Sequence, residues 1–337
     1  MKKIVSFGDI HFSSIQEWSY EAGEHFIEWF ENTDFGPKEE LEFLFAGDIG
    51  QKDVNPGKVI DQMDRLFNSA SKKSKWTHII VGNHDRKLYH NQDQHSLMFL
   101  ENKGNITVYE KETIVDSKNG FRMLLLPFQR ADDVIPLTLH DYYTNYIKNI
   151  ENKKFDIVAG HWQVKSAEIG WASDGVDISP LTEVGCWALG HIHTRDRKEY
   201  IGSIFPNNKD EQKTRFRRCY KEYNEKGQCV EFPLPEFLHY GEIKYGNQIP
   251  EPIKNCAMVY TILNIGNETL AREKYPNIYI RGIEKNISAN FDEISSDEEI
   301  DENFKVNLKE SFTEMVKETG MRIDRNTYKL CIDLLED

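Results

Sequence analysis

The sequence predicts an α/β domain built from layers of strands and helices, and two observations carry this prediction. Short apolar runs alternate with polar or helical stretches through the first two-thirds of the chain, which is typical of layered α/β folds. Several of these runs end in glycine followed by a polar residue, as at the sheet edge where α/β proteins place their sites. The expected strands are residues 3–7, 41–46, 77–81, 106–109, 121–127, 155–159 and 186–189.

Two stretches between these strands have the pattern of amphipathic helices. Apolar side chains recur at the helical period in residues 21–31 and again in residues 58–69. Each stretch therefore predicts a helix that packs one face against a sheet.

From about Tyr200 the character of the chain changes. Three further apolar runs predict a strand meander that closes a first domain, residues 1–240. Prolines then interrupt the chain, and residues 250–285 predict a small strand–helix–strand domain. The runs of the meander are residues 200–205, 215–224 and 228–234.

The C-terminal part of the chain is acidic and then helical in pattern. Residues 292–302 hold seven acids and no base, which suits an exposed linker, here residues 286–302. Apolar residues then recur at helical spacing in residues 303–337. We expect either a packed helix or a detached element that docks on a partner.

Charge is unevenly distributed along the chain. The net charge of −14 at first sight disfavours nucleic acid as a partner. Residues 286–337 hold 14 acids and 6 bases, whereas residues 195–221 hold 9 Lys and Arg against 4 acids. The second segment is either a local basic face or an ordinary solvated surface.

The cysteines and the N-terminus indicate the compartment. No stretch approaches the ~20 apolar residues that span a bilayer, and the first strand reaches the charged Asp9 too early for a signal peptide. We therefore expect a cytoplasmic protein whose cysteines are all reduced, without a disulfide framework or a thiolate zinc site. The five are Cys186, Cys219, Cys229, Cys256 and Cys331.

Polar residues with metal-binding chemistry follow five of the expected strands. Two Asp, one Asn and four His would meet at one sheet edge. Oxygen and imidazole donors suit Mn, Fe or Zn rather than Ca. Seven donors are too many for one tetrahedral ion but suit two ions that share a bridging group. Pairs of metal ions of this kind commonly catalyse in-line displacement at phosphorus. The seven are Asp9, His11, Asp48, Asn83, His161, His191 and His193.

In their order along the chain, the motifs that hold these residues resemble those of the calcineurin-like metallophosphoesterase superfamily. The resemblance implies a four-layer α/β/β/α sandwich. It also implies one ion held by Asp9, His11, Asp48 and His193 and a second held by Asp48, Asn83, His161 and His191, with Asp48 bridging. The motifs are Asp9-Ile10-His11, Gly47-Asp48, Gly82-Asn83-His84-Asp85, Gly160-His161 and Gly190-His191-Ile192-His193.

The resemblance also assigns roles to the two residues after Asn83. His84 matches the histidine that stabilises the transition state or protonates the leaving oxygen. Asp85 would then orient His84 by accepting its other ring N–H.

Within the superfamily, the chain is most similar to the SbcD-type DNA-repair exonucleases. Asn83-His84-Asp85 differs from the Asn-His-Glu of the serine/threonine phosphatases, and Tyr200-Ile201-Gly202-Ser203 matches a turn of the exonuclease branch. Phe12-Ser13 and Ile49-Gly50-Gln51 depart from the usual residues of that branch, but no metal ligand is lost.

The similarity to that branch implies a Mn²⁺-dependent 3′-to-5′ exonuclease and single-strand endonuclease of DNA repair and recombination. It implies a capping domain in 250–285 and docking of 303–337 on an SbcC-type, SMC-like ATPase. It also implies a homodimer through 58–69 and 88–100, although the apolar run Leu97–Leu100 could equally pack on the sheet. If the chain is phage-encoded, its compartment is the host cytoplasm.

A DNA substrate would give the basic segment a role in phosphate binding. The alternatives are a phosphatase or phosphodiesterase acting on small or protein phosphoesters, and a non-catalytic scaffold for an ATPase. The candidate DNA-binding residues are Arg195, Arg197, Lys198, Arg215, Arg217 and Arg218.

Overall fold

The computed structural model places most of the chain up to residue 284 in one compact unit, Met1–Glu284. The expected acidic linker and C-terminal helical element lie outside the described residues. The structure describes residues 1–51, 56–87, 95–101, 103–129, 138–165, 175–193, 197–206, 209–212, 218–263, 268–276 and 278–284.

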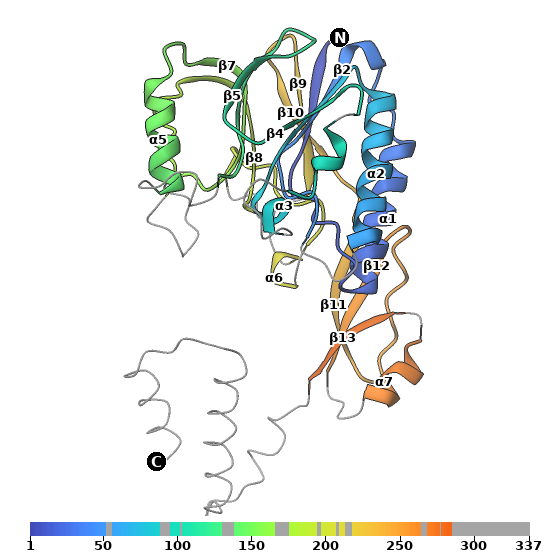
Figure 1. Ribbon diagram of the computed structural model, residues 1–337. Coiled ribbons are helices and arrows are strands. Elements are labelled where there is room, and N and C mark those ends of the chain that lie inside the picture. The colour runs from blue at the N-terminus through green and yellow to red at the C-terminus, as the bar shows by residue number, and fades with distance from the viewer. Residues whose placement is uncertain are drawn as a thin grey trace, which may run out of the picture. The chain divides into compact units, whose positions relative to one another are not determined.

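A six-stranded sheet combines strands from the N-terminal part of the chain with two strands from residues 219–233 (Figure 1). Its strand order is β10-β9-β1-β2-β3-β4, with β1 to β4 parallel and with β9 antiparallel to β1. The strands are β1 (Lys3–Phe7), β2 (Leu41–Phe45), β3 (Trp76–Ile80), β4 (Ile106–Tyr109), β9 (Cys219–Asn224) and β10 (Cys229–Pro233).

A second sheet of four strands, ordered β5-β6-β7-β8, faces the first. The pairs β6–β7 and β7–β8 are parallel, and β5 forms an antiparallel hairpin with β6. The strands are β5 (Thr113–Asp116), β6 (Arg122–Leu126), β7 (Lys154–His161) and β8 (Glu183–Gly190).

The alternation of side chains along each strand builds the layers. In β2, Phe43 and Phe45 point to a core shared with α1 (Glu17–Asn32) and α2 (Pro56–Lys73), whereas Leu44 points between the two sheets. Strands buried on both faces read as continuous apolar runs, which is why the sequence reveals them.

The outer face of the second sheet has its own helix. Leu124 and Leu126 of β6 pack with α5 (Leu139–Asn149), and Met123 and Leu125 face the first sheet. In Figure 1, α1 and α2 lie together on one side of the two sheets and α5 on the other.

A small three-stranded parallel sheet follows the meander. It comprises β11 (Leu238–Lys244), β12 (Ala257–Leu263) and β13 (Tyr279–Glu284), with α7 (Glu268–Lys274) between the last two. One face, with Val259, joins the core of α1, and the opposite face packs on α7. The short helices elsewhere are η1 (Lys38–Glu40), α3 (Asn83–Lys87), η2 (Met98–Leu100) and α6 (Lys209–Gln212).

The mixed α/β prediction is confirmed, as are the seven expected strands and the strand–helix–strand unit. Of the three runs that were expected to form the meander, residues 200–205 are not a strand. They form only a bridge from Tyr200 to Leu189, and their backbone then bonds to residues that follow β8 and β1. β11 begins before residue 240 and belongs to the small sheet. No described helix is both long and apolar enough to cross a membrane.

The prediction that all cysteines are reduced is wrong for one pair. Cys186 of β8 and Cys229 of β10 form a disulfide, with their Cα atoms 5.6 Å apart. They are 43 residues apart in sequence and meet because β8 and β10 are edge strands of the two facing sheets. Cys219 and Cys256 are free and buried, and Cys331 lies outside the described residues.

The apolar run expected at a dimer surface is mostly internal. Leu97 and Leu100 are fully buried in the core beneath α2, and Phe99 packs against the same core. Only Met98, 42% exposed, faces solvent. Packing on the sheet therefore explains Leu97 and Leu100, and the homodimer stays a prediction.

Candidate metal centre

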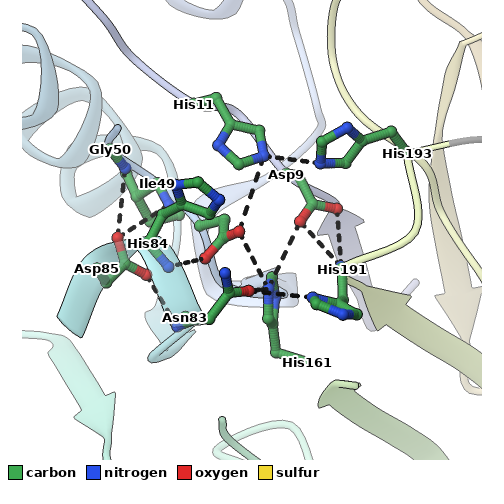
Figure 2. Close-up of polar contacts among 12 residues, drawn as sticks. Asp9, His11, Ile49, Gly50, Asn83, His84, Asp85, His161, His191 and His193 are labelled. Carbon is green, nitrogen blue, oxygen red and sulfur yellow. Dashed lines mark hydrogen bonds and ion pairs between the residues drawn. The ribbon is translucent and has the colours of Figure 1, made fainter. Parts of the chain in front are cut away.

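The carboxyl ends of strands from both sheets converge on one cluster of polar side chains (Figure 2). Asp9 follows β1, Asp48 follows β2 and Asn83 begins α3 after β3. His161 ends β7, and His191 follows β8. Because these strands are parallel within each sheet, their ends lie at the same edge.

The backbone of the cluster is held in uncommon conformations. His11, Asp48 and His191 have φ values of 56°, 50° and 78°. They are three of the four non-glycine residues with positive φ in the described parts of the chain. The carbonyl of Asp48 accepts bonds from the amides of Ile10 (3.1 Å) and His11 (3.0 Å), which fixes the two loops together. Such conformations concentrate at functional sites.

Two glycines give the cluster its room. A Cβ on Gly82 would collide with the carboxylate and amide of Asp48, and a Cβ on Gly190 would meet the ring of His161. Glycine is therefore required at both positions for the polar side chains to approach one another.

The first expected ligand set is assembled around two facing rings. Nε2 of His11 lies 2.9 Å from Nε2 of His193 and 3.7 Å from Oδ2 of Asp48. Asp9 offers a carboxylate oxygen within 4.8 Å of both histidines. Two imidazole nitrogens and a carboxylate that point to one spot form a donor set suited to a divalent transition-metal ion.

The second set is assembled around the side-chain oxygen of Asn83. Oδ1 of Asn83 is 3.0 Å from Nε2 of His161 and 3.0 Å from Nδ1 of His191. Nε2 of His161 is 3.2 Å from Oδ2 of Asp48. Nδ1 of His161 donates to the carbonyl of Ala46 at 2.7 Å, which leaves the Nε2 lone pair for a ligand. The structure thus brings all seven predicted residues together, and their donor atoms fit divalent metal ions.

Charges inside the cluster perturb one another. Burial raises the pKa of Asp48, but the neighbouring histidines, His161 first and then His11 and His84, together outweigh burial and lower the pKa below its usual value. Burial lowers the pKa of His161, yet Asp48 raises it to about 9. Burial and then the charge of His161 lower the pKa of His191 to about 3. A cation bound here would replace the proton on His161, so binding should release protons.

His84 lies at the edge of the cluster. Its backbone N–H donates to Oδ1 of Asp48 at 2.7 Å, and its ring centroid is 4.9 Å from that of His11. The ring therefore borders the space that the ligand sets enclose, as its predicted role requires.

Asp85 differs from the prediction, because it does not accept the ring N–H of His84. Its Oδ1 accepts from the amides of Ile49 (3.1 Å) and Gly50 (3.3 Å), and its Oδ2 accepts from Gly82 (2.9 Å). The carboxylate is fully buried and ties the loop after β2 to the start of α3. Burial, and then the charge of Asp48, raise the pKa of Asp85 to about 7.

The described candidates for DNA binding mostly have partners within the chain. Arg197 forms two 3.2 Å bonds with the carboxylate of Glu199. Arg218 is partly buried and donates to Oγ of Ser203 at 2.8 Å. Lys198 is exposed. The remaining candidates, Arg195, Arg215 and Arg217, lie outside the described residues.

Sequence reasoning missed Glu211 of α6. Its Oε1 lies 3.0 Å from Nδ1 of His193, and both side chains are largely buried. The available signal was weak: an acid in a segment otherwise rich in Lys and Arg.

A separate group of potential ligands is less suited to a metal. Nε2 of buried His95 lies 3.3 Å from Glu110 and 3.5 Å from Glu101. Nδ1 of His95 accepts the backbone N–H of Leu97 at 3.2 Å. The proton of the neutral ring therefore sits on Nε2 and faces the carboxylates, so no lone pair is offered there.

Comparison with known proteins agrees with this geometry. The family model described as calcineurin-like phosphoesterase matches residues 2–195, more than half of the chain. A search of curated proteins finds no match. The family uses divalent metals to hydrolyse phosphoesters, which the Asp and His groups of the centre fit. The chain therefore belongs to the calcineurin-like phosphoesterase family.

Proposed function

We propose that this phosphoesterase is a DNA nuclease with two Mn²⁺ ions that acts as a 3′-to-5′ exonuclease and single-strand endonuclease in repair or recombination. The observation that carries the proposal is the convergence of seven donor residues and His84 where the carboxyl ends of strands from both sheets meet. A non-catalytic scaffold would have no need to retain this complete set.

The turn that resembles the exonuclease branch lies against the centre, which supports a nuclease. The amide of Ser203 donates to the carbonyl of His193 (3.2 Å), and the amide of Ile204 donates to that of Asp9 (2.8 Å). The hydroxyl of Tyr200 accepts from the amide of Val164 at 2.8 Å. Ser203 of this turn thus supports the backbone of the predicted ligand His193, and Ile204, directly after the turn, supports that of Asp9.

The reaction assigns distinct tasks to the residues of the centre. When bound, the two ions offset negative charge on the phosphate and activate water at neutral pH. Asp9, Asp48, Asn83 and the four ligand histidines would hold them. His84, placed beside His11, would donate a proton to the leaving oxygen, a contribution of about 10²–10⁴-fold in rate.

The architecture is interpreted within the same proposal. Two facing sheets with α1 and α2 on one side and α5 on the other correspond to an α/β/β/α sandwich. The small sheet of β11 to β13 would be the capping domain. A homodimer, and docking of residues 303–337 on an SbcC-type, SMC-like ATPase, complete the proposal.

A metallophosphatase acting on small or protein phosphoesters is the second candidate. One observation favours it: Arg197 and Arg218 are engaged by Glu199 and Ser203, which reduces the basic surface offered to DNA. The same metal centre would serve either substrate.

The test is hydrolysis of end-labelled single- and double-stranded DNA in Mn²⁺, with para-nitrophenyl phosphate in parallel. Asp48→Asn and His84→Ser should abolish cleavage. Glu222→Gln, which removes a carboxylate paired with Lys3 on β1, is the control that should retain it. Intact DNA together with turnover of the small ester would refute the nuclease and favour the phosphatase.

A further inference from the structure

We propose that Glu211 and Arg218 form a brace that fixes His193 as a metal ligand and thereby sets the affinity of one of two metal positions. The inference rests on the two-metal centre of the proposed function but not on the identity of the substrate.

The side chain of His193 is oriented by Glu211. Nδ1 of His193 lies 3.0 Å from Oε1 of Glu211, and the two side chains are 23% and 15% exposed. A proton on Nδ1 is then shared with the carboxylate, so Nε2 keeps its lone pair. Nε2 is the atom that lies 2.9 Å from Nε2 of His11. A carboxylate behind a histidine fixes its tautomer and makes it a stronger ligand.

The backbone of His193 is held by the same network. Its carbonyl accepts the N–H of Ser203 at 3.2 Å. Arg218 donates through Nη1 to Oγ (2.8 Å) and the carbonyl (3.2 Å) of Ser203, and through Nη2 to the carbonyl of Glu211 (3.4 Å). The bonds form a closed ring through His193, Ser203, Arg218 and Glu211.

The helix that carries Glu211 depends on external support. α6 spans only Lys209–Gln212, too short to be stable by its own hydrogen bonds. Besides Arg218, the side chain of Gln212 anchors it by donating to Oε1 of Glu236 at 2.7 Å. Glu236 lies 2.9 Å from Nδ1 of His239 on β11. α6 is therefore tied to the small sheet on one side and to the metal centre on the other.

The brace supports only one of the two ligand sets. His193 groups with Asp9 and His11. In the other set, His161 is oriented by the carbonyl of Ala46, at 2.7 Å, rather than by a residue of α6. Loss of Glu211 should thus weaken one ion and spare the other.

The experiment is calorimetric titration of Mn²⁺ into the metal-stripped full chain. Wild type should bind two ions, and Glu211→Ala should bind one of them about 10–100-fold more weakly. Glu211→Gln should lose less because its amide oxygen can still accept from Nδ1. Arg218→Met should fall between wild type and Glu211→Ala.

Glu222→Gln is the matched control. Glu222 is 17% exposed and pairs with Lys3 at 3.0 Å, so its burial and ion pairing are similar to those of Glu211. It makes no contact with a predicted ligand among the described residues, and both Mn²⁺ affinities should match wild type.

The outcomes separate the two proposals. Fewer than two ions in wild type would overturn the two-metal function itself. Two ions in wild type with unchanged affinities in both Glu211 variants would overturn the brace. Equal weakening of both ions, with a lower melting temperature of the metal-free chain, would mean that Glu211 serves general stability and would overturn it too. Wild-type affinities for both ions in Arg218→Met would overturn the part of the brace that is assigned to Arg218.

Discussion

Replacement of Asp85 by Asn tests whether this carboxylate is a backbone clamp or a partner of His84. The carboxylate accepts three buried amides, from Ile49, Gly50 and Gly82. The Asn oxygen can still serve Ile49 and Gly50, but its NH₂ group would then face the N–H of Gly82. Two buried donors would lack acceptors, at about 1–3 kcal/mol each. Asp85→Asn should therefore lower the free energy of unfolding by about 2–6 kcal/mol.

The assay is urea unfolding of the full chain at pH 8. The pKa of Asp85 is about 7, so at pH 8 the variant is compared mainly with the ionised carboxylate. Asp34→Asn is the matched control. Asp34 accepts the amide of Gly36 at 2.8 Å in an exposed turn that Asn also supports, so its effect should stay within about 0.5 kcal/mol.

Equal stability of the two variants would refute the clamp. If Asp85→Asn then lost activity as His84→Ser does, the role expected from the sequence, orientation of His84, would be restored. The clamp is supported if Asp85→Asn is much less stable than wild type and its activity falls only in proportion to the fraction of chains that remain folded.

Three further predictions follow from the structure. Because Asp48 holds the pKa of His161 at about 9, above its usual 6.5, their ion pair stabilises the fold fully below pH 6.5. This stabilisation is lost as the pH rises towards 9, so urea unfolding in EDTA should show falling stability over that interval, and a flat profile would contradict the pairing. Hydrolysis of either substrate should cease in EDTA and return with Mn²⁺ but not with Ca²⁺, because the oxygen and imidazole donors suit the transition metal; activity in EDTA would exclude a metal mechanism. Thiol titration of the denatured, unreduced chain should find three reactive cysteines, since Cys186 and Cys229 are paired, and five would disprove the disulfide.

Burial on both faces explains which strands the sequence reveals. β2 and β6 lie between a helix layer and another sheet, so nearly every side chain is apolar. β5 alternates half-buried and exposed residues, and because it contains Thr113 and Asp116 its sequence resembles that of a loop. α5 carries three tyrosines on a short amphipathic helix, which gave too weak a periodicity to predict. β11 contains His239 and Gly241 in a strand that pairs only within the small sheet.

The residues of the metal centre also fall into two groups. Some could be predicted from the order of strands along the sequence, whereas others are placed only by the course of the loops in space. Asp9, Asp48, Asn83 and His161 were predictable because each stands at or near the end of a parallel strand, and strand ends must meet. Asp85 was misassigned because its neighbour in sequence, His84, is not its neighbour in space: the first turn of α3 directs the carboxylate to the amides of another loop. Glu211 escaped prediction for the converse reason. It lies 18 residues beyond His193, and only the path of the intervening chain returns it to the ring. Acids that interrupt a basic segment after a strand-end histidine are thus worth examining as supports of that histidine, because an isolated buried carboxylate requires a hydrogen-bonding partner.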